Sequence, residues 1–380
     1  MQHLNFKKII WKIFYFAMNQ FVLTIAVLAT LVTCIFVPID KQYLSYFDWR
    51  TLATLFCTLA VVCAFSHIHV FEILSRNIVR KLHTLRNATL GLVFITFIGS
   101  MILANDMALL TFLPLGWYVL NSTNNRQALA FTFIMQNIAA NLGGMVTPFG
   151  NPQNLYLYSY YHIETREFVQ IMLPIFLAAT LLIVVVCLFV KNTPLTLEKE
   201  ENYTLDYKRT LIYSVLFAAS ILIVFRIVPY IIGTIIITLL LLLLDKKAIR
   251  KVNYPLLATF CVFFIFSGNI SRIPAVSEFF SWLLPKNTLL IGILSCQVIS
   301  NVPSAVLLSH FTNDYQSLLP AVNIGGLGTI IASLASLITI SEYRLHDPKG
   351  LKRYFVKFSV LNIGFLIILY IVQSIVLALY

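Results

Sequence analysis

The stretch NLGGMVTPFGNPQN, residues 141–154, interrupts an otherwise apolar part of the chain, with FTFIMQNIAA before it and LYLYSYY after it. It contains three glycines, two prolines, three asparagines, one threonine and one glutamine. Glycines permit unwound backbone, and prolines leave carbonyl groups without their usual N–H donors. Irregular backbone at membrane depth is tolerated only where protein buries it or where it lines a watery cavity. The stretch therefore predicts a broken helix that offers oxygen atoms to such a cavity.

The composition of the 380-residue chain is typical of a membrane protein. Hydrophobic residues make up 59% of it and charged residues 11%, whereas soluble domains carry roughly a quarter charged residues. Several uncharged runs approach or reach the length of a membrane span, and they lack the alternation of outer-membrane strands. The six cysteines lie in or beside apolar runs without metal-ligand or redox spacing, so we expect them to be small core residues. We predict an all-α polytopic membrane protein.

Nine spans and two hairpins account for the apolar segments. Residues 88–119 and 288–311 are each too long for one span and too short for two, and Asn105 and Asn301 interrupt their middles. We interpret both as re-entrant hairpins that reach mid-membrane and return to the same side. The nine spans are expected at about residues 13–37, 51–68, 128–161, 169–190, 210–229, 230–244, 254–270, 317–341 and 356–380.

The positions of lysine and arginine predict the orientation in the membrane. With the N-terminus inside, 21 of the 27 basic residues fall in cytoplasmic segments and six in outer segments, as the positive-inside rule requires. We therefore predict a multi-pass protein of the cell membrane with its N-terminus inside and its C-terminus outside. The net charge of +12 is explained by topology and by attraction to anionic lipid, and it does not indicate a nucleic-acid partner.

The pattern of the broken helix occurs a second time. Residues 141–144 read NLGG and residues 323–326 read NIGG; in each copy a threonine follows the asparagine by six residues, and Asn154 or Ser336 follows it by thirteen. The first hairpin is expected to enter from inside and the second from outside. An inverted repeat with paired broken helices is typical of secondary transporters, whose site lies where the repeats meet. We predict two units, one repeat with its scaffold spans in each, at residues 1–209 and 210–380.

The predicted site combines groups for a cation with groups for an anion. Oxygen-rich breaks suit a hard cation, and the helix that returns from each hairpin tip directs its positive end toward an anion. Asp106 is the only acid that the predicted topology places inside the membrane, so we expect it to bind the coupling cation or proton, the alternative being a helix cap. The expected ion-binding residues are Asp106, Asn105, Asn141, Gly143, Asn151, Asn154, Asn301, Asn323, Gly325 and Ser336. The expected substrate-binding residues are Asn105, Asn301, Ser300, Ser304, Thr147 and Thr329.

Four segments resemble signatures of the ion transporter superfamily: LANDMALLTFLPL, NLGGMVTPFGNPQN, ISNVPSAVLL and NIGGLGT. This superfamily contains arsenite permeases, sodium–proton antiporters of the same fold and divalent-anion:sodium symporters, including the citrate-transporter-like domain. The resemblance covers nearly the whole chain and implies an elevator-type homodimer, in which the hairpins and broken helices move against a scaffold. The tip Ser300-Asn301-Val302 partly matches the Ser-Asn-Thr signature of the anion symporters, whereas Ala104-Asn105-Asp106 is closer to the arsenite-permease and antiporter branches.

The predicted function is secondary active transport of a small anion, a carboxylate or an oxyanion such as arsenite, coupled to sodium or protons. A sodium–proton antiporter that uses Asp106 and an ion channel are the alternatives. An enzyme is disfavoured because the sequence places no second acid, no Ser–His pair and no metal-ligand cluster at membrane depth. There is no P-loop, so ATP is not an expected partner, and we expect no cofactor or metal beyond a transported sodium ion.

Overall fold

The computed structural model describes residues 21–70, 73, 82–195 and 205–379, and every structural statement below concerns this part of the chain. Its regular elements are helices, apart from one isolated bridge between Thr84 and Pro194. Seven helices are long and apolar enough to cross a membrane, and three shorter apolar helices accompany them. The predicted all-helical polytopic fold is thus confirmed. The first part of the predicted first span and the basic residues between positions 74 and 81 lie outside the described residues.

The first half follows the predicted order of span, hairpin, broken span and span. α2 (Phe21–Phe36) and α3 (Trp49–His67) are joined through the 3-10 helix η1 (Lys41–Tyr46). The first hairpin consists of α5 (Leu85–Leu103) and α6 (Asn105–Ser122). The broken span is divided into α7 (Leu129–Gly143) and α8 (Pro152–Tyr160), and α9 (Thr165–Leu188) follows it.

The second half repeats this order. It begins with α10 (Tyr207–Val224), α11 (Tyr230–Leu244), the short α12 (Lys246–Arg250) and α13 (Tyr254–Ser271). A helix that the sequence did not predict, α14 (Pro274–Leu283), leads to the second hairpin of α15 (Thr288–Ile299) and α16 (Asn301–Leu308). The second broken span comprises α17 (Tyr315–Ile324) and α18 (Leu334–His346), before the long α19 (Leu351–Leu379).

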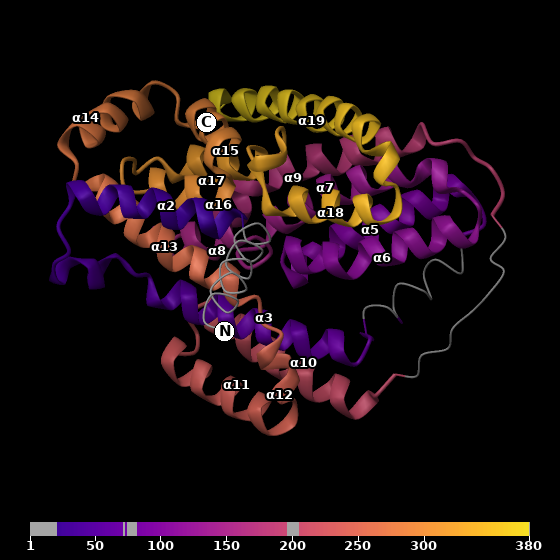
Figure 1. Cartoon of the computed structure of the whole chain (residues 1–380), viewed down its shortest axis with the longest axis horizontal. Coiled ribbons are helices and arrows are strands. Elements are labelled where there is room, and N and C mark those ends of the chain that lie inside the picture. Colours follow the sequence, from indigo (N-terminus) through magenta and orange to yellow (C-terminus); the bar gives the residue numbers. More distant parts are fainter. Residues whose placement is uncertain (1–20, 71–72, 74–81, 196–204, 380) are drawn as a thin grey trace, which may run out of the picture.

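The hairpins and broken spans pack on one another in matching pairs. Within the first half, α5, α6 and α7 contact one another, as do α15, α16 and α17 in the second half. Between the halves, α18 packs against α6 and α7, and α8 packs against α16 and α17. In Figure 1 the α5–α6 hairpin lies to the right and the α15–α16 hairpin left of it, near the centre. The hairpins therefore approach the middle of the molecule from two sides.

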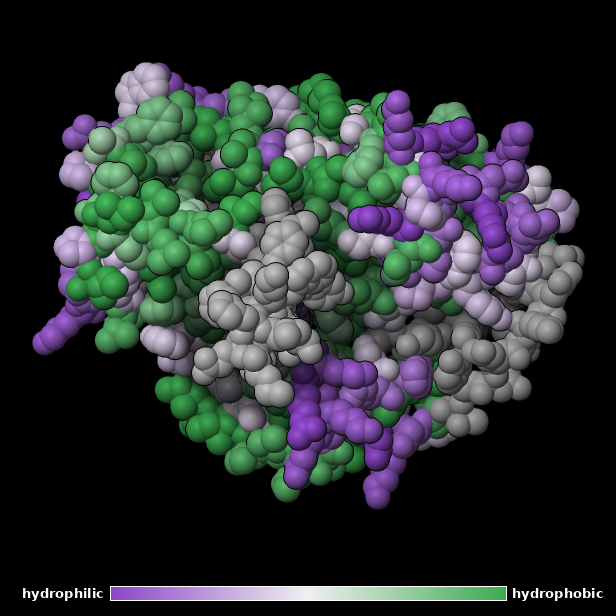
Figure 2. Space-filling model, in the orientation of Figure 1, coloured by the Kyte–Doolittle hydropathy of each residue, from purple (hydrophilic) through white to green (hydrophobic). Residues whose placement is uncertain are grey.

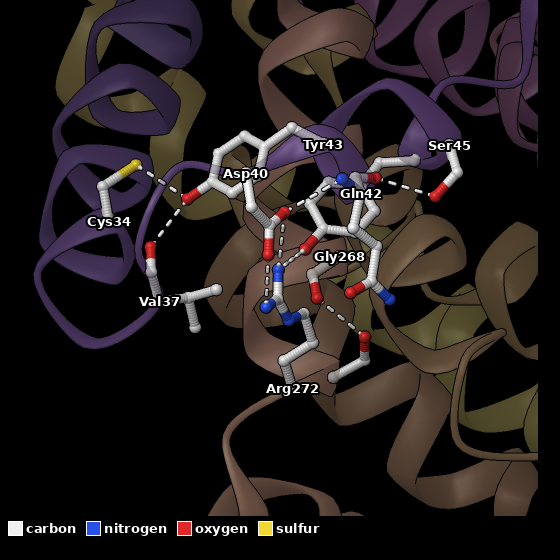
Figure 3. A network of polar contacts seen from close by, with 10 residues as sticks. Cys34, Val37, Asp40, Gln42, Tyr43, Ser45, Gly268 and Arg272 are labelled. Atoms are coloured by element: carbon white, nitrogen blue, oxygen red, sulfur yellow. Dashed lines mark hydrogen bonds and ion pairs between the residues drawn. The ribbon is translucent and has the colours of Figure 1, made fainter.

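A polar cluster at one end of the molecule ties the segment after α2 to the end of α13 (Figure 3). Arg272 Nη2 donates to Asp40 Oδ2 at 2.7 Å, and its Nη1 donates to the Tyr46 hydroxyl at 2.9 Å. The ring of Tyr46 lies against Gly268, at a distance that leaves no room for a Cβ. Asp40 also caps η1 by accepting a hydrogen bond from Gln42 N. The hydrogen bond from Arg272 holds the pKa of Asp40 below its usual value.

Replacement of Arg272 by Gln is expected to weaken the dependence of stability on acid pH. A carboxyl group with a lowered pKa in the folded state adds stability above its unfolded pKa, and this stability is lost as the pH falls through the folded pKa. The pair is exposed to solvent, so the effect is small. The loss of Tm on acidification from about pH 6 to about pH 3, measured in detergent, should be slightly smaller for Arg272→Gln than for the wild type. Lys41→Gln is the control, and a steeper loss for Arg272→Gln would contradict this reasoning.

Candidate functional site

The two hairpin tips have the same backbone shape. The residue before each tip asparagine has a positive φ: Ala104 has φ 66° and ψ 148°, and Ser300 has φ 74° and ψ 158°. Residues other than glycine rarely adopt this conformation, and it persists where the surrounding structure holds it, often at functional sites. Asn105 and Asn301 then begin α6 and α16, and the side-chain oxygen of each accepts a hydrogen bond from the next backbone N–H, at 3.0 Å and 2.9 Å. The tips therefore match in geometry as well as in sequence.

Both tips line one cavity of about 570 Å³. Much of its wall comes from α13 and α18, and its exposed lining residues are Ser341 and Leu345 of α18 and Leu110 of α6. Its polar lining consists of Asn105, Asp106, Asn253, Thr259, Ser300, Asn301, Ser333, Ser341 and Glu342. Two of these residues are acids, and no lysine or arginine is among the described residues that line the cavity. The ionisable side chains on the cavity wall are therefore both acids, and Glu342 Oε1 lies 3.1 Å from Nε2 of His346.

Asp106 lies at the inner end of this cavity and is 5% exposed. Its backbone N–H donates to Asn105 Oδ1, whereas its carboxylate forms no hydrogen bond or ion pair with any residue that the structure describes. A buried carboxylate without a partner is unfavourable unless a proton or a cation neutralises it. The Asp106 side chain does not cap α6, because this helix has no side-chain hydrogen bond at its N-cap. The geometry therefore favours ion binding over capping as the role of this carboxylate.

The two helix breaks hold each other through reciprocal hydrogen bonds. Asn151, which follows Asn141 by ten residues, donates to Asn323 Oδ1 at 3.0 Å. Ser333, which follows Asn323 by ten residues, donates to Asn141 Oδ1 at 2.9 Å. Asn105 of the first tip also donates to Asn141 Oδ1, at 3.3 Å. All five side chains are buried, so both breaks and the first tip form one polar network.

Side-chain amides donate hydrogen bonds to several backbone carbonyl oxygens of the unwound segments. Asn154 Nδ2 donates to the carbonyl oxygens of Gly144 and Met145 at 3.3 Å and 3.1 Å. Gln297 Nε2 donates to those of Gly325 and Leu327 at 2.9 Å and 3.0 Å. In this conformation these oxygens stabilise the unwound backbone, and a coupling ion would have to compete with an amide for them.

The two threonines of the repeated pattern fasten each break to its own hairpin. Thr147 Oγ1 donates to the carbonyl oxygen of Met101 at 2.9 Å, and Thr329 Oγ1 donates to that of Gln297 at 3.2 Å. Met101 and Gln297 each precede their tip asparagine by four residues. Neither threonine lines the cavity. Their matching contacts position the breaks, and substrate contact by either one stays a prediction.

The predicted site residues fall into two groups. Asn105, Asp106, Ser300 and Asn301 line the cavity together. The others lie away from its wall and hold the breaks and the second hairpin in place: Asn141, Gly143, Thr147, Asn151, Asn154, Ser304, Asn323, Gly325, Thr329 and Ser336. Sequence reasoning missed five polar lining residues: Asn253, Thr259, Ser333, Ser341 and Glu342. The ten-residue spacing of Asn151 from Asn141 would have indicated Ser333, and Glu342 was missed because the predicted span ended at residue 341, whereas α18 continues to His346.

The chain that forms this site matches a known family over most of its length. The match, to the family described as citrate transporter, covers residues 9–314, which include both hairpins and the first break. The chain belongs to the citrate transporter family. This membership confirms the resemblance to the ion transporter superfamily, and it makes the protein a membrane transporter.

Two relatives align with this chain over about four-fifths of their length. The chain is 31% identical over 294 residues to the uncharacterized transporter MJ0456 of Methanocaldococcus jannaschii, in an alignment that covers 77% of this chain and 80% of the relative. It is 28% identical over 316 residues to the inner membrane protein YbiR of Escherichia coli, which covers 80% of this chain and 83% of the relative. Both alignments extend over most of the citrate transporter match.

Proposed function

We propose that this membrane transporter is a secondary active carrier of a small anion, a carboxylate or an oxyanion such as arsenite, coupled to sodium or protons. One observation carries the proposal: two hairpin tips, each the start of a helix, meet at a single cavity beside the buried carboxylate of Asp106. Helix N-termini favour an anion, and an unpaired carboxylate favours a cation or a proton. Both partners of a coupled carrier thus find a counterpart at the same place.

An inverted repeat that works by an elevator-like movement is part of this proposal. The matching contacts of α5–α8 and α15–α18 support it, as do the reciprocal bonds between the breaks. Figure 2 shows hydrophilic side chains gathered at the right and at the lower centre of the molecule, and hydrophobic ones over the upper left. The cavity is lined by Ser341 and Leu345 near the end of α18. The predicted orientation assigns Arg344 and Lys349 to the cytoplasmic side, so in this proposal the structure is the inward-open state.

Uptake into proteoliposomes tests the proposal. Labelled citrate, succinate, sulfate and arsenite are offered under an imposed sodium gradient, an imposed proton gradient, or neither. We expect at least one anion to accumulate only when a gradient is present. Accumulation of none of them under either gradient would contradict anion-coupled transport.

A sodium–proton antiporter is the second candidate, and the acidic residues on the wall of the cavity favour it. Among the described residues that line the cavity, the ionisable side chains are those of Asp106 and Glu342, and their ionised forms attract cations more readily than anions. In that case a sodium gradient would drive proton flux in the absence of any added anion, with Asp106 as the exchanging carboxylate. Conductance that needs neither gradient coupling nor Asp106 would indicate a channel instead.

A further inference from the structure

The N-terminal ends of α3 and α13 are counterparts. Residues 48–54 read DWRTLAT and residues 253–259 read NYPLLAT. Asp48 and Asn253 each cap their helix by accepting from the backbone N–H three residues later, at 3.0 Å and 3.1 Å. Thr54 Oγ1 and Thr259 Oγ1 each donate at 2.7 Å to the carbonyl oxygen four residues earlier. Shared sequence and shared hydrogen bonds thus place Thr54 and Thr259 at equivalent positions.

α8 and α18 are counterparts in the same way, since each resumes the helix after its break. Asn141 and Asn323 are 182 residues apart in the sequence. The same spacing relates Leu155 to Leu337 and Ser159 to Ser341, and in each pair the two residues are of the same type. A wall formed by α13 and α18 in one half therefore has an equivalent wall, formed by α3 and α8, in the other half.

These equivalent walls differ in their separation: α13 and α18 lie apart, whereas α3 and α8 are in contact. α13 and α18 border the open cavity through Pro255, Leu256, Thr259, Leu337 and Ser341. The five equivalent residues Arg50, Thr51, Thr54, Leu155 and Ser159 line a seam between α3 and α8, which are in contact. The seam leaves no space for a water molecule. α3 begins on the left of Figure 1, whereas α18 ends on the right, so seam and cavity mouth lie toward different sides.

The seam also differs from the cavity in charge. Arg50 and Arg226 line it, and none of the described residues along it is an acid. Arg226 is anchored, because its Nη2 donates to the carbonyl oxygen of Tyr158 at 2.6 Å and its guanidinium lies 4.9 Å from the centre of the Tyr158 ring. The Nε of Arg50 is buried and has no hydrogen-bond partner among the described residues. A buried donor without a partner is unfavourable, so Arg50 gains a partner when the seam admits an anion or water.

We propose that the seam between α3 and α8 opens in the alternate state of the carrier and forms its second entrance, where Arg50 receives the anion. The inference rests on the proposed function, because it assigns a route to the anion of that function. A planar guanidinium binds carboxylates and oxyanions through paired hydrogen bonds, which suits the substrate class proposed above. The acidic cavity and the basic seam then give the two entrances opposite charge.

Cysteine labelling tests the opening of the seam without knowledge of the substrate. Ser159 is 8% exposed, so a Ser159→Cys variant would be unreactive if the seam never opened. We expect a membrane-impermeant maleimide, added to intact cells, to label Ser159→Cys well above the wild type, whose native cysteines serve as the blank. A short bifunctional thiol reagent should join Thr54→Cys to Ser159→Cys in the double variant and block uptake, whereas either single variant should keep its uptake. No labelling, together with full uptake after cross-linking, would overturn the proposed opening whatever the substrate is.

The role of Arg50 is tested separately, with labelled citrate and arsenite as the probes. Loss of one charge-assisted hydrogen bond predicts a rise in KM of at least about tenfold for Arg50→Gln, and Arg50→Lys should recover part of it. Labelling of Ser159→Cys should be unaffected by Arg50→Gln, because the substitution changes anion capture and not movement. An unchanged KM would remove Arg50 from the proposal. Absence of uptake in the unmodified protein, with Ser159→Cys still labelled, would reject the anion carrier and retain the moving seam.

Discussion

Asp106→Asn is expected to lower ion-coupled uptake by at least about a hundredfold without lowering thermal stability. Asparagine keeps the shape of the side chain and removes the charge that attracts the coupling ion. The carboxylate has no hydrogen-bond or ion-pair partner among the described residues, so its removal leaves no neighbouring polar group without a hydrogen bond. Loss of an unpaired buried charge should leave the Tm unchanged or raise it. Gradient-driven flux in proteoliposomes and Tm in detergent, measured on the same preparation, separate an ion-binding role from a structural one.

Two further variants complete this experiment. Asp106→Glu keeps the charge and should retain part of the coupling, although the longer side chain shifts the carboxylate. Glu278→Gln removes an exposed acid of α14, away from the cavity, and should behave as the wild type. A drop of several degrees in the Tm of Asp106→Asn with full uptake would instead make Asp106 a helix cap.

The breaks and hairpins were predicted from asparagine, glycine and proline, which are unfavourable within helices. The tips were predicted at Asn105 and Asn301, and the helices do break there, at the residue immediately before each asparagine. Glycine and proline after Asn141 mark the end of α7 in the same way. α14 was missed because residues 274–283 are too short for a span, and a search for spans passes over such helices.

The sequence could not predict which hydrogen-bond partners the side chains of the site have. An amide such as Asn154 or Gln297 is equally able to bind an ion or to bond a nearby carbonyl oxygen. Which of these it does depends on how close the packed elements bring that carbonyl group. The predicted units at residues 1–209 and 210–380, one repeat with its scaffold spans in each, stay a prediction. Elements of the two units contact each other, since α18 packs on α6 and α7 while α8 packs on α16. The side of the membrane that each end faces stays a prediction.

Asn323→Leu is expected to destabilise the protein more than any other single change in the network. Asn323 is 1% exposed, and its Oδ1 accepts from Asn151 and Gln153 at 3.0 Å and 3.3 Å. Its Nδ2 donates to Asn154 Oδ1 at 2.6 Å. Leucine would leave Gln153 Nε2 and Asn154 Oδ1 buried without these partners, at about 1–3 kcal/mol for each group. Because the network joins both breaks, uptake should be lost along with stability.

Asn362→Leu is the matched control, since it makes the same substitution at another buried position. Asn362 Nδ2 bonds only the carbonyl oxygen of Phe358 in its own helix, and its Oδ1 has no partner among the described residues. Leucine at this position removes an oxygen that has no hydrogen bond, and it leaves no other side chain without a partner. The Tm should therefore stay constant or rise. Equal losses of Tm for the two variants would mean that volume, and not the reciprocal bonds between the breaks, determines stability at Asn323. A large loss for Asn323→Leu alone would identify those bonds as the link that makes the two halves one structure.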